Sequence, residues 1–213
     1  MNKIIFDLDN TLLIWEDEYI NVLIEVLNEF GIYENYEEIN DIIDKYDKNC
    51  KILDKEDLLN IINNRFNYKL DMSFMDKLLG NQGKKCCVIS PKIKPLLEYL
   101  NKKYELYILT NWFTDCQVAR LKNTDIYKYF KEVYCGDENI VKPNKEAFLN
   151  IIKDGSPKEY TVIGDSYESD IKPALELNMN AIWLTKKEDD KKVKKINSLE
   201  ELYNILWGVI WKK

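Results

Sequence analysis

The sequence contains no histidine. This absence excludes Ser-His-Asp and Cys-His catalysis, histidine-ligated zinc and any imidazole acid or base. Five cysteines are present, but no two have a C-x-x-C spacing, so we expect reduced, mostly buried thiols. An enzyme with this sequence must take its proton chemistry from carboxylates, lysine, tyrosine or cysteine.

Glycine and proline are also scarce, with 7 and 5 residues among 213. Apolar residues make up 46% and charged residues 32%, which indicates a globular chain. No apolar run approaches the length of about 18 residues that is typical of a membrane span. We therefore expect a soluble, cytoplasmic protein. The net charge of −6 is spread along the chain and the lysines form no basic stripe, so nucleic-acid binding is not expected.

Alternating apolar runs and helical periods predict a doubly wound α/β protein with a parallel sheet. The predicted strands are residues 3–6, 106–109, 132–134, 160–163 and 181–184. The predicted helices between the later strands are residues 92–103, 114–122, 144–153 and 168–177, and the segment "SLEELYNILW" predicts a closing helix. The lysine-rich residues 186–195 before it are interpreted as a solvated loop.

One segment interrupts this alternation, because from residue 15 to about residue 87 the only persistent period is helical. Apolar stripes predict four helices there, with Gly31 ending the first and Asp54 capping the third. Ser73 and Gly80 bound the fourth. We therefore predict an all-helical cap domain at residues 15–87, inserted into a core formed by residues 1–14 and 88–213.

Polar side chains follow four of the predicted strands. They are Asp7 and Asp9 in "IIFDLDNTLL", Thr110 and Asn111 in "LYILTN", Lys142 in "NIVKPNKEAF", and Asp165 and Asp170 in "GDSYESD". Because the carboxyl ends of parallel strands line one crevice, we expect these side chains to meet in a single site.

Several carboxylates in one crevice repel each other and resist ionisation unless a cation lies among them. Mg²⁺ suits such a site, because it needs few carboxylates and takes further ligands from water and phosphate oxygens. Lys142 and the Thr110 hydroxyl are then interpreted as groups that hold a phosphoryl oxygen or an anionic nucleophile.

These four motifs, in this order and each after a predicted strand, resemble those of the haloacid dehalogenase-like (HAD) hydrolase superfamily. The resemblance covers essentially the whole chain and is to the phosphatase branch with a C1-type helical cap. It implies a Rossmann-like core and Mg²⁺ as the cofactor. It also implies that Asp7 is the nucleophile that forms an aspartyl-phosphate and that Asp9 is the general acid and base.

The resemblance implies roles for the other motif residues as well. Thr110 and Asn111 match phosphate-binding positions, and Lys142 matches the lysine that orients the nucleophile and neutralises phosphoryl charge. Asp165 matches a direct Mg²⁺ ligand, and Asp170 a supporting residue. The metal would also be held by Asp7 and by the backbone carbonyl of Asp9.

The implied function is a Mg²⁺-dependent phosphatase that acts on small soluble phosphomonoesters. Asp9 argues against a dehalogenase, which needs no acid at that position. A phosphomutase of the same superfamily stays open, as does a phosphate-binding module without catalysis. A phosphonate hydrolase of this superfamily needs a cap lysine as a Schiff base, and nothing in the sequence marks one of the cap lysines as buried. Trp15, Tyr19 and Trp112 are candidates for the substrate pocket, with core or hinge packing as the alternative. The sequence indicates neither the physiological substrate nor an oligomeric state.

Overall fold

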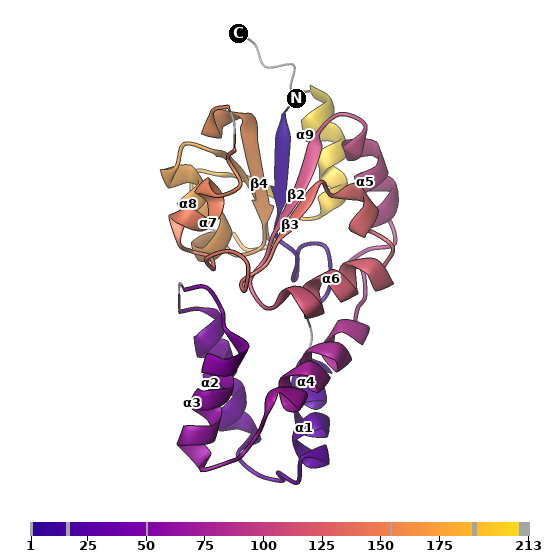
Figure 1. The fold of residues 1–213 in the computed structure, drawn as a ribbon. Coiled ribbons are helices and arrows are strands. Elements are labelled where there is room, and N and C mark those ends of the chain that lie inside the picture. The colour runs from indigo at the N-terminus through magenta and orange to yellow at the C-terminus, as the bar shows by residue number, and fades with distance from the viewer. Residues whose placement is uncertain (1, 16–17, 50, 154, 189–190, 209–213) are drawn as a thin grey trace.

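A computed structural model describes residues 2–15, 18–49, 51–153, 155–188 and 191–208 (Figure 1). Within these residues, the strands form one parallel sheet in the order β3-β2-β1-β4-β5-β6. Their bounds are β1 Lys3–Phe6, β2 Glu105–Leu109, β3 Glu132–Tyr134, β4 Tyr160–Gly164, β5 Asn180–Leu184 and β6 Lys194–Ile196. The predicted doubly wound α/β class is confirmed.

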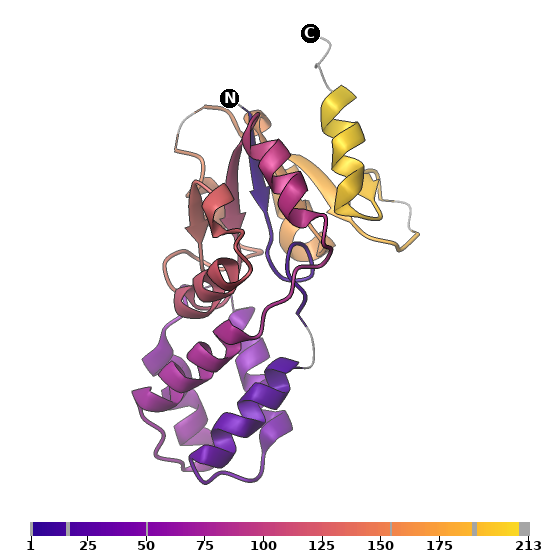
Figure 2. The same ribbon diagram turned by 90° about the vertical axis from the view of Figure 1, so that its right-hand side faces the viewer.

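Helices cover both faces of this sheet (Figures 1 and 2). On one face lie α5 (Ile93–Asn101) and α9 (Leu202–Gly208), and on the other α7 (Lys145–Leu149) and α8 (Lys172–Glu176). The central strand β1 is apolar on both sides for this reason: Ile4 and Phe6 pack into the cluster of α5, and Ile5 into the cluster of α7 and α8.

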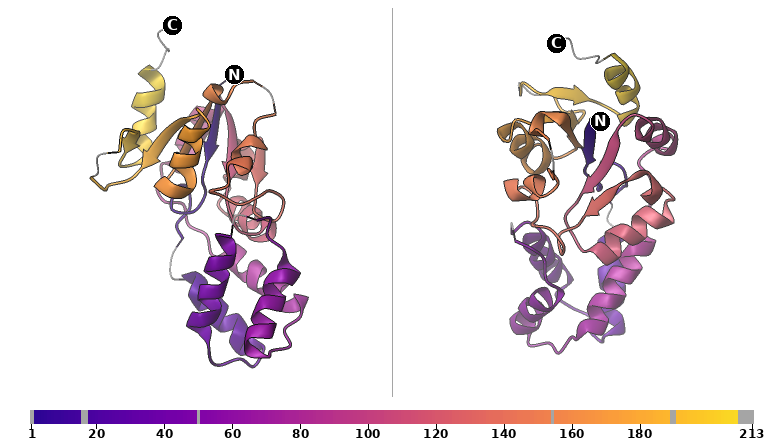
Figure 3. Two further views of the ribbon diagram at one scale, coloured as in Figure 1. Left: turned by 90° about the vertical axis from the view of Figure 1, so that its left-hand side faces the viewer. Right: turned by 45° about the horizontal axis from the view of Figure 1, so that its top comes forward.

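Four helices separate β1 from α5 in the sequence and lie beyond the carboxyl ends of the strands (Figures 1 and 3). They are α1 (Glu18–Glu29), α2 (Tyr36–Asp47), α3 (Lys55–Phe66) and α4 (Met72–Lys84). Their apolar cluster also contains Trp112, Phe113 and Cys116, which belong to the segment after β2. The helices therefore share an apolar contact with the rest of the molecule, and a domain division at residues 15–87 stays a prediction.

Local signals explain most of the boundaries of these helices. Gly31, with a φ of +78°, follows the end of α1, and Asp54 caps α3 by accepting a hydrogen bond from Asp57 N at 2.9 Å. The predicted end of the fourth helix at Gly80 is wrong, because α4 continues to Lys84. Its last turn packs closely on α6 (Thr114–Asn123), where a Cβ at Gly83 would lie only 2.9 Å from Ala119 Cβ.

Three other expectations need correction. Residues 194–196 form the edge strand β6, although the sequence suggested a solvated loop; β6 pairs with β5 through its backbone while its lysines remain at the sheet edge. The predicted helix at 168–177 consists of the π-helical turn η3 (Tyr167–Ile171) followed by α8. The predicted helix at 144–153 is shorter, as α7.

The described cysteines are free thiols, of which Cys116 and Cys135 are buried, Cys86 is half-buried and Cys87 is exposed. Cys50 lies outside the described residues. Within the part of the chain that the structure covers, no helix has the length and apolarity to cross a membrane.

Candidate active site

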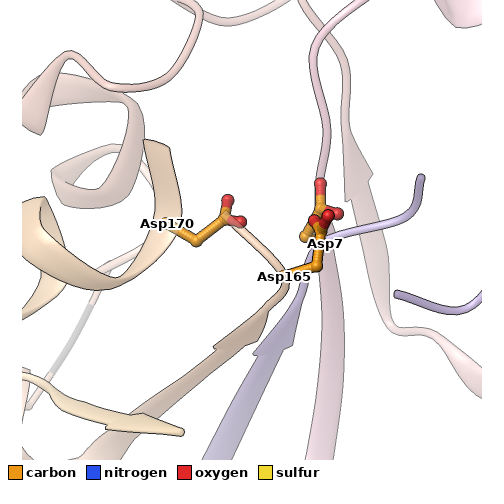
Figure 4. Close-up of side chains that lie close together, drawn as sticks. All are labelled: Asp7, Asp165 and Asp170. Atoms are coloured by element: carbon orange, nitrogen blue, oxygen red, sulfur yellow. The ribbon is translucent and has the colours of Figure 1, made fainter. Parts of the chain in front are cut away.

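Three carboxylates meet at the carboxyl end of the sheet (Figure 4). Asp7 directly follows β1, Asp165 directly follows β4, and Asp170 lies in η3. One carboxylate oxygen from each residue lies within 4.8 Å of those of the other two. The adjacency of β1 and β4 in the sheet places Asp7 beside Asp165, which is the arrangement expected from the sequence.

Lys142 joins this cluster from the loop after β3. Its ammonium is buried, and Nζ lies 2.6 Å from Asp7 Oδ1 and 2.6 Å from Asp170 Oδ1. Burial alone would lower the pKa of Lys142, but the Asp170 and Asp7 carboxylates outweigh it and raise this pKa. Lys142 is therefore a fixed positive charge between two carboxylates.

The backbone and Lys142 together hold Asp170 in place. Asp170 Oδ2 accepts a hydrogen bond from Ser166 N at 3.1 Å, while Oδ1 is bound to Lys142. Gly164 leaves the necessary space, because a Cβ there would overlap with the Asp170 carboxylate. With both of its oxygens engaged, Asp170 suits a supporting position, and Asp7 and Asp165 are the better placed ligands for a cation.

The electrostatics of the cluster fit a divalent cation. Burial, reinforced by the Asp7 charge, raises the pKa of Asp165 to about 6. Burial also raises the pKa of Asp170, against the opposing effect of Lys142. Lys142 supplies one positive charge against three carboxylates, so a hard cation with oxygen ligands would relieve the remaining repulsion. The donor set of carboxylate oxygens is one that Mg²⁺ prefers.

These shifts predict how stability depends on pH without metal. A carboxyl group with a raised pKa holds its proton more tightly in the folded than in the unfolded chain, so the free energy of unfolding falls as pH rises through the interval between the two pKa values. With Asp165 at about 6, we expect a lower melting temperature at about pH 7 than at about pH 5 in excess chelator. Mg²⁺ should raise it mainly at the higher pH.

Calorimetry at the two pH values, with and without Mg²⁺, checks this expectation. The Asp165→Asn variant is the matched control, because the amide does not titrate. The fall in melting temperature between the two pH values should become smaller, while Asp170, whose pKa is also raised, keeps part of it. A melting temperature that rises from pH 5 to pH 7 in the wild type and ignores Mg²⁺ would contradict the proposed cation site.

Asp9 points to a different set of partners. Its Oδ1 lies 2.5 Å from Arg120 Nη1, and its Oδ2 accepts a hydrogen bond from Gln117 Nε2 at 2.8 Å. Arg120 is fully buried and also donates to Gln117 Oε1 at 2.7 Å and to the Ile14 carbonyl at 3.2 Å. Burial raises the pKa of Asp9, and Arg120 opposes that rise. Neither Arg120 nor Gln117 was predicted from the sequence; their spacing of three residues, on one face of α6, was the available signal.

Thr110 and Asn111 directly follow β2 and form hydrogen bonds with Gln117, which binds Asp9, and with the backbone of Lys142. Gln117 Nε2 also donates to Thr110 Oγ1 at 2.9 Å, and the Thr110 hydroxyl donates to the Asn111 carbonyl at 3.1 Å. Asn111 Oδ1 accepts a hydrogen bond from Lys142 N at 2.9 Å, and its Nδ2 donates to the Lys142 carbonyl at 3.2 Å. Asn111 thereby fixes the backbone that carries the Lys142 ammonium.

The three aromatic candidates all line the same cavity, but each also packs against the protein. The Trp15 and Tyr19 rings stack with their centroids 3.8 Å apart, Arg120 lies over both rings, and Tyr19 Oη donates to the Lys85 carbonyl at 2.9 Å. Trp112 is buried, with its Nε1 donating to Gln82 Oε1 at 3.0 Å. Its φ of +72° is one that favours glycine, so this packing holds a strained backbone.

A cavity of about 420 Å³ lies between the sheet end and the helices α1 and α2. Its wall on the sheet side includes Asp7, Asp9, Thr110, Asn111, Lys142, Asp165 and Asp170, so the structure brings together every motif residue singled out from the sequence. Its wall on the helical side includes Ile20, Leu23, Asn40, Ile43, Asp44, Asp47 and Lys48. A small molecule placed there would contact both.

Comparison with known families agrees with the motif order. The family model of haloacid dehalogenase-like hydrolases matches residues 4–184. The chain belongs to this family. It is therefore a hydrolase with the HAD fold, and the resemblance inferred from the four motifs is confirmed at the level of the superfamily.

Two curated relatives of this HAD hydrolase align with most of its length. The pyrimidine 5'-nucleotidase PynA of Streptococcus pneumoniae is 29% identical over 84% of this chain and 82% of its own. The glyceraldehyde 3-phosphate phosphatase of Methanocaldococcus jannaschii is 28% identical over 95% of this chain and 96% of its own. Both names describe the removal of phosphate from small molecules.

A solved structure shows the same fold. The HAD-hydrolase YfnB of Bacillus subtilis, determined bound to magnesium, superposes with a TM-score of 0.75 over 96% of this chain and 98% of YfnB, at 22% identity. A sequence alignment with YfnB reaches 31% identity over 123 residues, which are 52% of this chain and only 51% of YfnB. At 22% sequence identity, the superposition shows that the two proteins share a fold and shows nothing about a shared activity.

Proposed function

We propose that this HAD hydrolase is a Mg²⁺-dependent phosphatase of small soluble phosphomonoesters and that it works through an aspartyl-phosphate on Asp7. The observation that carries the proposal is Lys142, buried and bound to both Asp7 and Asp170 beside the carboxylate of Asp165. The two relatives that align with most of the chain are named a nucleotidase and a phosphatase, and these names support the same reaction class.

Asp7 is the nucleophile in this proposal. Its carboxylate attacks the phosphorus of the bound ester, and the bond between phosphorus and the alcohol oxygen breaks. Lys142 holds Asp7 through Oδ1 and offsets the negative charge that the phosphoryl group brings into the site. Most of the remaining catalysis is positioning and charge neutralisation, which requires no histidine.

Asp9 supplies the proton chemistry. It protonates the alcohol oxygen as it leaves, and it then takes a proton from the water that hydrolyses the aspartyl-phosphate. Arg120 and Gln117 hold its two carboxylate oxygens in the structure, so its position is fixed from α6.

Asp7, Asp165 and the Asp9 carbonyl would hold Mg²⁺, with Asp170 supporting the site through Lys142. When bound, the ion neutralises charge on the transferring phosphoryl group. Helices α1–α4 would form the cap, at residues 15–87, that encloses the substrate and keeps bulk water away.

A phosphate-release screen over about a hundred phosphorylated metabolites and a phosphopeptide, with Mg²⁺, tests the whole proposal. Release from none of the small esters, or release from the phosphopeptide in preference to them, would contradict it.

The Asp9→Asn variant separates the acid from other roles. We expect kcat/KM for alkyl phosphates to fall by about 10² to 10⁴, the usual contribution of a positioned acid. For nitrophenyl phosphate the loss should be much smaller, because nitrophenolate leaves without protonation. The ratio kcat/KM reports only the steps up to departure of the alcohol, so the later hydrolysis of the aspartyl-phosphate does not obscure the comparison.

Equal losses for the two kinds of ester would argue against Asp9 as the acid. A thermal melt of the variant accompanies the kinetics, because the amide leaves the buried Arg120 without its carboxylate partner.

A further inference from the structure

Asp47 is a cavity residue that neither the motifs nor the proposed mechanism uses. It is the last residue of α2, and it lines the cavity opposite the catalytic carboxylates. Its Oδ1 is shielded from solvent and accepts no hydrogen bond from the residues that the structure describes. A buried carboxylate oxygen without a donor is costly, so the stability of the fold does not account for Asp47 at this place.

The backbone of Asp47 is fixed relative to the catalytic residues. The Asp47 carbonyl accepts a hydrogen bond from Asn111 Nδ2 at 3.1 Å, and the same amide nitrogen donates to the Lys142 carbonyl at 3.2 Å. One side chain therefore sets the separation between Asp47 and the Lys142 backbone. An atom bound by Asp47 would lie at a defined place relative to a phosphoryl group bound beside Lys142.

Helix stability does not explain a carboxylate at this position. The carboxyl end of a helix carries a partial negative charge, so an aspartate there is unfavourable. The Nζ of the adjacent Lys48 forms an ion pair with Asp44 at 2.6 Å. Burial, with a further contribution from Asp9, raises the pKa of Asp47 to about 6 against the opposing effects of the Trp112 backbone N–H and of Lys142, so at neutral pH the group is mostly ionised.

We propose that Asp47 determines substrate specificity by accepting a hydrogen bond from a hydroxyl or ammonium group on the alcohol part of the phosphomonoester. Its charge excludes alcohol parts that place a carboxylate at the same point. Phosphates of polyols and amino alcohols are therefore the favoured class, and phosphorylated carboxylic acids are disfavoured. This inference rests on the proposed phosphatase function and adds the substrate class to it.

The test uses esters that differ only in their end group. Two-carbon and three-carbon alkyl phosphates are compared with methyl, hydroxyl, ammonium or carboxylate at the far end, together with nitrophenyl phosphate. In the wild type, kcat/KM should be about tenfold higher for the hydroxyl and ammonium esters than for the methyl ester at one chain length, and lowest for the carboxylate. Ratios between esters are compared, since any change in negative charge alters binding of all phosphates together.

Two substitutions then separate charge from hydrogen bonding. Asp47→Asn keeps an acceptor and loses the charge, so the preference for hydroxyl over methyl should persist while the ratio of ammonium to carboxylate falls about tenfold. Asp47→Ala should lose both preferences. Asp41→Asn is the matched control, because Asp41 is an exposed carboxylate on the same helix and does not line the cavity; its ratios should equal those of the wild type.

Unchanged ratios in both Asp47 variants would overturn the inference, as would an equal shift in the Asp41→Asn control. Should Asp47→Ala fail to fold, the nearly isosteric Asp47→Asn decides alone through the ratio of ammonium to carboxylate. Nitrophenyl phosphate distinguishes a failure of the proposed role of Asp47 from a failure of the proposed phosphatase function. Its hydrolysis by the wild type with Mg²⁺, together with flat ratios, would reject only the role of Asp47, whereas no hydrolysis of any ester would reject the phosphatase function itself.

Discussion

Asp7→Asn should lose phosphate release from every ester, by about 10⁴-fold or more, while the protein still folds. The amide has nearly the shape of the carboxylate, but it is a poor nucleophile and does not form the aspartyl-phosphate. The cluster has three carboxylates for one ammonium, so the amide gives up a contact with Lys142 and relieves repulsion from Asp165 at the same time. These opposing effects should keep the melting temperature within about 4 °C of the wild type.

Asp7→Glu is the informative companion, since it keeps the charge and moves the attacking oxygen by one methylene. Both variants should be inactive if Asp7 is the nucleophile. If Asp7 acted only through its charge, Asp7→Glu would retain much of the wild-type rate. Retention of more than a few per cent of turnover by Asp7→Asn would remove Asp7 from the nucleophile role altogether.

Removal of divalent metal should silence the enzyme as completely, and added Mg²⁺ should restore it. Asp165 supports this expectation, because its carboxylate lies beside those of Asp7 and Asp170 and burial raises its pKa to about 6. Ca²⁺ should restore little activity: it takes more ligands at longer distances and would draw a second Asp oxygen into its shell.

Asp165→Asn should raise the Mg²⁺ concentration for half-maximal activity by at least about tenfold. The measurement is a metal titration of nitrophenyl phosphate hydrolysis, with Asp41→Asn as the control for a general loss of negative charge. Full activity in excess chelator, or equal metal requirements for the two variants, would contradict the role of Asp165.

Period and composition were sufficient to predict the strands that carry the site. β1 and β3 have the predicted bounds. β1 is a short run that is buried on both faces, as in a central parallel strand, whereas β3 is only half-buried and was indicated by its β-branched and aromatic residues Val133 and Tyr134. β6 was missed, since only Ile196 of this strand is buried and its lysines resemble those of a loop. Edge strands are identified by a neighbour to pair with, and that neighbour is known only from the fold.

Some residues of the site could likewise be predicted from local sequence, whereas others are known only from the fold. The motif residues stand at strand ends, where local sequence and parallel topology together place them. The contact between Asp9 and Arg120 joins residues 111 positions apart, and no local pattern predicts it. Asp47 stands in a run of charged residues at the end of α2, where the ordinary interpretation is a solvated helix end, and only the structure shows that one of its oxygens is enclosed.

The bond from Asn111 to the main-chain carbonyl of residue 47 has a consequence for the history of this enzyme. Every amino acid has that carbonyl, so the tether survives any exchange of the side chain at position 47. On the proposed role of Asp47, mutation there would therefore retune substrate choice while Asn111 continues to hold the loop that carries Lys142. Position 47 is thus a point at which selection, or a directed-evolution library, can change preference at low risk to turnover.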